Sequence, residues 1–156
     1  STRLALTLLL QSCREQLPAT ALDLGTGTGI LAMALALSGV PRVLALDNDP
    51  EAVAVADDNV MANRLQHIIQ VAGTPLEQVA GPFDCICANI VHDVLIELAP
   101  RLASLLAPGG SLILAGILGG AQEDNIIRRY AELGLHEGKR LHQDEWVGIL
   151  LCKTPT

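Results

Sequence analysis

Three glycines at alternate positions, Gly25, Gly27 and Gly29, separate a short apolar run from a second apolar run. Glycine has no Cβ, so it can adopt a positive φ and bring the backbone close to a ligand. A helix that begins near Thr28 would direct its unpaired N–H groups at the same point. The glycines therefore predict a ligand-binding turn between a strand and a helix.

A carboxylate follows this turn at an informative distance. Asp47 ends the apolar run 42–46 and lies twenty residues after Gly27. In α/β nucleotide sites an acidic residue at this distance lies beside the ribose hydroxyls. We therefore expect the chain to bind a cofactor that contains adenosine.

The glycines fit two cofactor motifs. From Gly27 the sequence matches the dinucleotide fingerprint G-x-G-x-x-[GA], and from Asp23 it matches D-x-G-x-G-x-G, which resembles the first motif of S-adenosylmethionine-dependent methyltransferases. In a dinucleotide site Asp23 would be an unpaired charge inside a buried strand, which is costly. In a methyltransferase it would sit at the mouth of the site and meet the ammonium of the methionine moiety, so Asp23 favours the methyl donor. A phosphate-binding P-loop is excluded, because no Lys followed by Ser or Thr comes after the glycines.

Composition limits the remaining classes. The 156 residues are 50% hydrophobic, which is consistent with one domain over residues 1–156 that buries a sizeable core. The net charge of −7 and only three aromatic residues argue against direct binding of nucleic acid. The sequence offers neither a membrane span nor a convincing signal peptide. The four cysteines fit neither a metal site nor a disulfide framework, so we expect reduced thiols in a cytoplasmic protein and no bound metal.

Periodicity and turn signals predict alternating helices and strands. Helices are expected over residues 2–16, 28–38, 49–63, 89–106 and 121–133, the fourth bent or restarted at Pro100. Strands are expected over residues 21–24, 42–47, 67–71, 83–88 and 111–115, followed by a hairpin of 139–142 and 146–152. Such alternation predicts an α/β fold with a mainly parallel sheet and helices on both faces.

Several of these segments resemble the ribosomal protein L11 methyltransferases, in the same order along nearly the whole chain. Besides the glycine motif, the more specific ones are Ala-Asn-Ile at 88–90 and Gly-Ile-Leu at 116–118. The resemblance implies a Rossmann-like class I methyltransferase fold, with a seven-stranded sheet that ends in an antiparallel hairpin. It also implies transfer of methyl groups from S-adenosylmethionine to lysine side chains and the N-terminal amine of a ribosomal protein.

The resemblance assigns roles to particular residues. Those that would hold the methionine end of the donor are Asp23, Gly25, Thr26, Gly27 and Gly29. Asp47 would hold the ribose, and Thr74 would border the adenine. Asn89, after the fourth strand, would contact the donor and receive the target amine as the catalytic residue.

Asn89 is also plausible on chemical grounds. Its side-chain oxygen can orient an N–H so that the nitrogen lone pair faces the methyl carbon, and alignment supplies much of the rate. A lysine ammonium, with a pKa of about 10.4, must lose a proton first, and partial burial beside a positive sulfonium favours that loss. The alternative is that Asn89 satisfies a turn. His92 is a possible base, although a single His in a first helical turn is usually structural.

Other functions stay open from the sequence alone. They are methylation of a different amine, a noncatalytic cofactor-binding module, and an NAD-dependent oxidoreductase domain. In the resembled family a recognition domain and a cofactor loop precede this segment, so we expect only the catalytic domain here. The ribosomal protein partner would then need that upstream domain.

Overall fold

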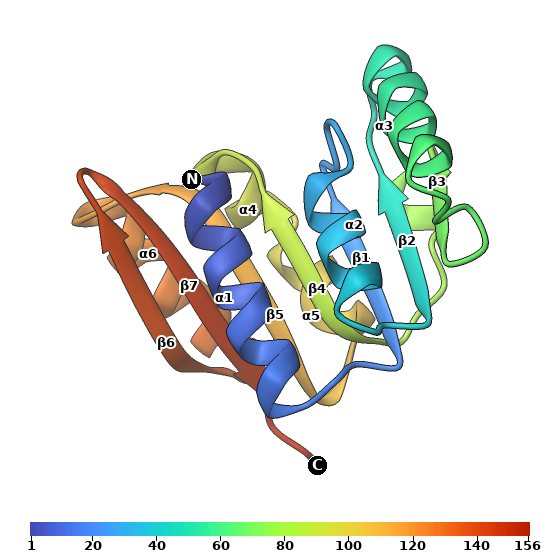
Figure 1. Cartoon of the computed structure of the whole chain (residues 1–156). Helices are drawn as coiled ribbons and strands as arrows, with labels where there is room; N and C mark the ends of the chain where they lie inside the picture. The colour runs from blue at the N-terminus through green and yellow to red at the C-terminus, as the bar shows by residue number, and fades with distance from the viewer.

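A computed structural model describes all residues 1–156 as alternating strands and helices (Figure 1). The strands are β1 (Thr20–Leu24), β2 (Arg42–Leu46), β3 (Ile69–Ala72), β4 (Phe83–Asn89), β5 (Leu106–Leu118), β6 (Leu135–Gln143) and β7 (Trp146–Lys153). The helices are α1 (Thr2–Glu15), α2 (Ile30–Leu37), α3 (Pro50–Ala62), α4 (His92–Glu97), α5 (Ala99–Leu105) and α6 (Ala121–Ala131), with a short 3₁₀ helix η1 (Leu76–Gln78).

All seven strands form one sheet in the order β3-β2-β1-β4-β5-β7-β6. Strands β1 to β5 pair in parallel, whereas β7 runs antiparallel to both β5 and β6. A helix follows most of the parallel strands and returns the chain from their carboxyl ends to the end of the sheet where the next strand begins. The predicted seven-stranded, mainly parallel sheet with an antiparallel hairpin at its end is thereby confirmed.

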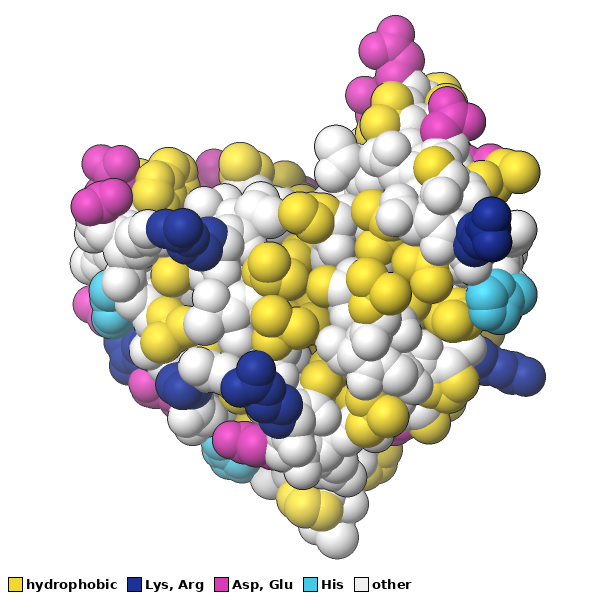
Figure 2. All heavy atoms as spheres, viewed as in Figure 1, with side chains coloured by type: hydrophobic (Ala, Val, Ile, Leu, Met, Phe, Trp, Pro, Cys, Tyr) yellow, Lys and Arg dark blue, Asp and Glu magenta, His cyan; other side chains and the backbone are white.

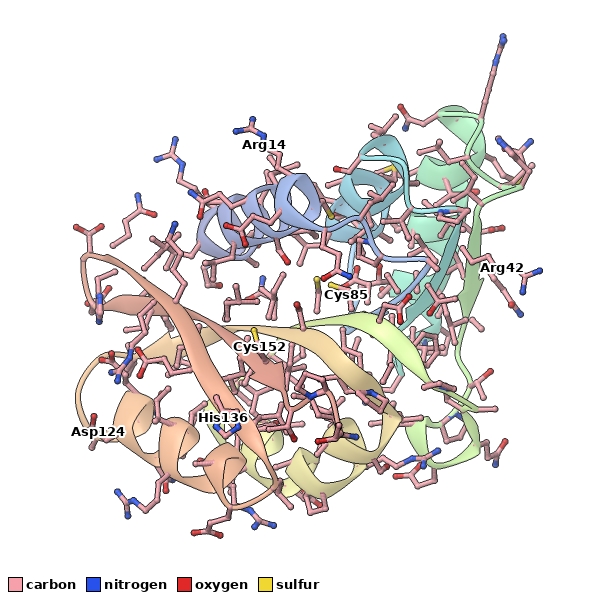
Figure 3. The ribbon with its side chains drawn as sticks, turned by 90° about the horizontal axis from the view of Figure 1, so that it is seen from below. Arg14, Arg42, Cys85, Asp124, His136 and Cys152 are labelled. Atoms are coloured by element: carbon pink, nitrogen blue, oxygen red, sulfur yellow. The ribbon has the colours of Figure 1, made fainter.

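Helices cover both faces of the sheet, with α1, α2 and α3 on one side and α4, α5 and α6 on the other (Figure 3). Strand β4 shows how one strand serves both layers, because successive side chains of a strand point to opposite faces. Cys85 and Cys87 belong to the core under α1 and α2, whereas Ile86 and Ala88 belong to the core on the other face.

Several element boundaries differ from the sequence-based expectation. Helix α2 begins at Ile30 instead of Thr28, because Gly29 has φ 88° and ends the turn in a left-handed conformation. The helix predicted over residues 89–106 begins only at His92. As expected, it restarts at Pro100, which lacks an N–H and lies in the first turn of the second helix. Strand β5 begins at Leu106 and includes the Pro-Gly-Gly segment as an irregularity in its pairing with β4.

The cysteines of the chain do not pair with one another. All four cysteines are free thiols, and Cys85 and Cys87 are buried while Cys13 and Cys152 are partly exposed. None of the helices combines the length and the apolar character that crossing a membrane requires.

Candidate functional site

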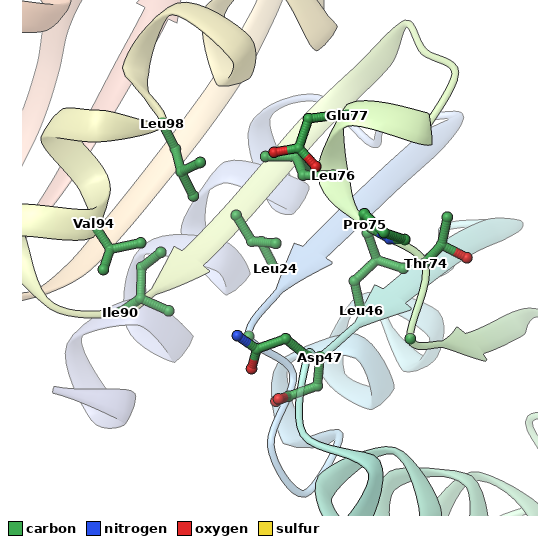
Figure 4. Close-up of a pocket in the computed structure, with 13 residues that line it drawn as sticks. Leu24, Leu46, Asp47, Thr74, Pro75, Leu76, Glu77, Ile90, Val94 and Leu98 are labelled. Carbon is green, nitrogen blue, oxygen red and sulfur yellow. The ribbon is translucent and has the colours of Figure 1, made fainter.

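A cavity of about 360 Å³ opens at the carboxyl ends of β1, β2 and β4 (Figure 4). The chain leaves β1 for β2 on one side and reaches β4 on the other, so the order of strands reverses at β1. Open α/β sheets bind ligands outside the carboxyl ends of the strands at such a switch point. The volume is in the range of small-molecule sites.

Gly25 borders this cavity, whereas Thr26, Gly27 and Gly29 of the same turn do not line it. Gly25, Gly27 and Gly29 all have positive φ, at 75°, 56° and 88°. The N–H groups of Gly25 and Thr26 donate to the carbonyl of Leu46 at 2.9 and 2.8 Å, which holds the turn against β2. A Cβ on Gly25 would lie 2.7 Å from Cγ2 of Ile90, so the turn also lies directly against the end of β4.

Asp47 links the glycine turn to the start of α3. Its Oδ2 accepts a hydrogen bond from the Gly27 N–H at 2.9 Å, and its Oδ1 accepts one from the Asp49 N–H at 3.1 Å. The carboxylate borders the cavity. Each carboxylate oxygen can accept more than one hydrogen bond, so Asp47 retains acceptor capacity for a pair of hydroxyl groups.

Asp23 is buried beneath the turn. The prediction that it lies at the mouth of the site is therefore wrong. Its side chain is 1% exposed, because β1 is central in the sheet and Asp23 pairs in register with Cys87 of β4. Oδ2 accepts a hydrogen bond from the buried Thr26 hydroxyl at 2.7 Å, whereas Oδ1 has no partner. Burial raises the pKa of Asp23 to about 6. The Thr26 hydrogen bond and the nearby Ala32 N–H, which does not reach hydrogen-bond geometry with Oδ1, oppose this rise, and the Asp47 charge adds to it.

The rest of the cavity is mainly apolar. Leu24 and Leu46 form its floor, Thr74 lies at one side as expected, and Leu98 lies across from it (Figure 4). Sequence reasoning missed the floor and the far wall, together with Glu77 in the middle of η1. Position 77 follows Thr74 closely, but a 3₁₀ helix of three residues leaves no periodic signal.

Asn89 ends β4 at the same edge of the sheet, although it does not line the cavity. Its Nδ2 donates a hydrogen bond to the Thr2 hydroxyl of α1 at 3.0 Å. Because side chains alternate along β4, Asn89 points to the same face as Cys87 and therefore as Asp23. Its neighbour Ile90 does line the cavity.

His92 does not line the cavity and contacts α6. Its Nε2 lies 2.9 Å from Nδ2 of Asn125, and its Nδ1 lies 2.8 Å from Oδ1 of Asp93. With 14% of its side chain exposed, His92 ties α4 to α6. This arrangement fits the structural interpretation of His92.

Comparison with known proteins connects this geometry to one family. The profile of the family described as ribosomal protein L11 methyltransferase (PrmA) matches residues 1–154. The ribosomal protein L11 methyltransferase of Brucella suis is 43% identical over 151 residues, which cover 94% of this chain and 53% of that protein. The one from Desulfotalea psychrophila is 39% identical and covers 98% of this chain and 51% of that protein. The chain thus spans about half the length of the curated relatives it matches.

Solved structures show the same fold. A ribosomal protein L11 methylase from Lactobacillus delbrueckii subsp. bulgaricus superposes with a TM-score of 0.86 at 31% identity, over 96% of this chain and 77% of that one. The N-methyltransferase NodS from Bradyrhizobium japonicum has a TM-score of 0.78 over 98% of this chain and 96% of that one, and at 22% identity it supports the fold alone. With the family profile matching almost every residue, the chain belongs to the ribosomal protein L11 methyltransferase family.

Proposed function

We propose that this chain binds S-adenosylmethionine and transfers its methyl group to amino groups of a ribosomal protein of the large subunit. The acceptors would be lysine side chains and the N-terminal amine. The observation that carries the proposal is Asp23, a buried carboxylate beside the glycine turn with one unpaired oxygen. An unpaired buried carboxylate favours a cationic ligand group and disfavours the pyrophosphate of a dinucleotide.

Residues that line the cavity, together with buried residues beneath the glycine turn, suit each part of this donor. Asp23, with the Gly25 to Gly29 turn and Thr26, would receive the amino-acid end, since the ammonium can compensate the Asp23 charge. Asp47 would accept hydrogen bonds from the ribose hydroxyls. Thr74 and the apolar walls would border the adenine. Glycines at positive φ let the backbone approach the donor without a Cβ in the way.

Asn89 is the residue we assign to the acceptor amine. Its Nδ2 is occupied by Thr2, which leaves Oδ1 to accept an N–H from the amine and direct the nitrogen lone pair. When bound, the donor supplies a methyl carbon whose bond to sulfur breaks as the amine nitrogen bonds to it, and S-adenosylhomocysteine leaves. The amine is neutral before this step, so its extra proton passes to water as it enters the site.

Recognition of the ribosomal protein would depend on a second part of the protein. The curated relatives are about twice as long as this chain, and the matched part covers 53% of the Brucella suis protein. We propose that the unmatched part supplies substrate recognition, and that methylation takes place in the cytoplasm with its ribosomal protein substrate.

Isothermal titration with S-adenosylhomocysteine and with NAD tests donor binding. We expect the chain to bind S-adenosylhomocysteine and not NAD, and Asp47→Ala to weaken that binding by about tenfold to a hundredfold, the effect of losing hydrogen bonds to a charged group. Tighter binding of NAD would assign the domain to oxidoreductases. Binding of the donor product without methyl transfer to any amine, even by the protein of full family length, would indicate a noncatalytic module.

A further inference from the structure

Two walls of the cavity come from segments that are distant in the sequence. Leu76 and Glu77 come from η1, whereas Val94 and Leu98 come from α4 and the residue after it. In Figure 4 these two groups face each other on either side of Leu24. The separation of the walls therefore determines what can be held between them.

Arg101 connects the two walls. It lies on α5, one helical turn after Leu98, and its guanidinium reaches across to η1. Nε donates to the carbonyl of Leu76 at 3.3 Å, and Nη2 donates to the carbonyls of Glu77, at 3.4 Å, and Val79. No carboxylate pairs with Arg101 among the ion pairs of the chain. All of its side-chain hydrogen bonds thus go to backbone carbonyls of η1 and of the residue that follows it.

Few other hydrogen bonds hold the opposite wall in place. Within η1 the backbone makes only short-range bonds, from Gln78 to Pro75 at 2.9 Å and from Val79 to Leu76 at 3.2 Å. Buried Leu76 and Val79 anchor its inner side. A guanidinium presents five donors in a rigid planar arrangement, so Arg101 can hold several carbonyls in one fixed geometry, whereas the three donors of a Lys share a single nitrogen on a flexible stem.

We propose that Arg101 is a positioning residue for the methyl donor: it holds η1 at a fixed distance from α5 and so sets the width of the slot that takes the adenine ring. This inference rests on the proposed function, because it assigns the cavity to the nucleoside of the donor. A planar ring gains most from two apolar walls when both contact it, so loss of the fixed spacing would weaken binding of the nucleoside.

The test is isothermal titration of Arg101→Leu and Arg101→Lys with two ligands. S-adenosylhomocysteine contains the whole donor skeleton, and 5′-methylthioadenosine contains the adenosine without the amino acid. We expect Arg101→Leu to raise the Kd of both ligands by the same factor, about tenfold to fiftyfold, and Arg101→Lys, which keeps the charge but fewer donors, to raise it by about threefold to tenfold. Arg128→Leu, at an exposed position of α6, is the matched control and should bind as the unchanged protein does.

A purely structural role of Arg101 would give a different result. The fraction of protein able to bind would fall, seen as a lower stoichiometry, while the Kd of the folded fraction stayed at the original value. An unchanged Kd in both variants would overturn the proposal, and Arg101→Lys decides the matter if Arg101→Leu does not fold. Failure of the unchanged protein to bind S-adenosylhomocysteine would instead overturn the proposed function.

Discussion

Asp23 opposes folding when it is charged, because burial leaves its Oδ1 without a partner. Its folded pKa of about 6 is above the unfolded value of about 3.9, so the folded state retains its proton to a higher pH. The unfolded state therefore loses this proton first, and the free energy of unfolding should fall as the pH rises from about 4 to about 6. We expect Asp23→Asn to abolish this fall, which is on the order of 1–3 kcal/mol.

Urea denaturation at pH 4 and pH 7 measures this difference, with Asp57→Asn at an exposed position of α3 as the matched control. In parallel, the affinity for S-adenosylhomocysteine should rise with pH through about 6 in the unchanged protein and stay flat in Asp23→Asn. A variant that is no more stable at pH 7 and binds with the same pH dependence would show that Asp23 has neither role.

Substitutions of Asn89 and His92 distinguish a residue that binds the acceptor amine from one that packs helices together. If Asn89 orients the amine and leaves the donor alone, Asn89→Ala should slow methyl transfer strongly while changing donor affinity by less than about threefold. His92→Ala should affect transfer much less, since His92 contacts Asn125 of α6. A radiolabelled methyl-transfer assay on ribosomal protein L11, with the protein of full family length, compares the two. A larger loss in His92→Ala would reverse the assignment of roles.

The strand-to-helix turn is the element on which the site depends most directly. A Cβ at Gly25 would lie 2.7 Å from Cγ2 of Ile90, and φ at Gly25 is 75°. Gly25→Ala should therefore destabilise the fold by about 1–3 kcal/mol and displace Ile90 into the cavity, with a loss of donor affinity of at least about tenfold.

Gly134→Ala provides the matched control for this turn. Gly134 has φ 86°, and a Cβ there would meet nothing within 4 Å. It should show the backbone strain alone, with donor affinity unchanged in calorimetry. Adding Ile90→Ala to Gly25→Ala should restore part of the lost stability, because it removes the contact. No recovery would mean that backbone strain, and not Ile90, accounts for the loss.

At the scale of the whole molecule, the surface shows more about attraction of a substrate than about its recognition. Asp and Glu side chains gather along the upper rim, at the β6–β7 tip and the start of α3, on the side where the parallel strands end (Figure 2). An acidic rim attracts cationic amines over a distance, although charge steers association more than it selects a partner. The chain has one Trp, one Tyr and one Phe, so it offers few of the aromatic side chains that commonly anchor protein interfaces.

We therefore expect this chain alone to bind the donor but to methylate ribosomal protein L11 slowly. Joining it to the part of the Brucella suis relative that it does not match should raise the rate about a hundredfold through alignment, and donor affinity much less. Single-turnover methylation with saturating donor compares the two proteins. Equal rates would mean that the residues present here already recognise the acceptor, and would favour a smaller amine as substrate.

The sequence alone determined the features that depend on short-range spacing. The glycine turn, the carboxylate of Asp47 after the second strand, the alternation of strands and helices and the closing hairpin were all predicted correctly, because turn chemistry and periodicity act over a few residues. Tertiary structure decided what depends on residues far apart in the chain. It buried Asp23 beside Cys87, bound His92 to Asn125 and joined Arg101 to η1. Such contacts follow from how the layers pack on the sheet, and no local pattern specifies them.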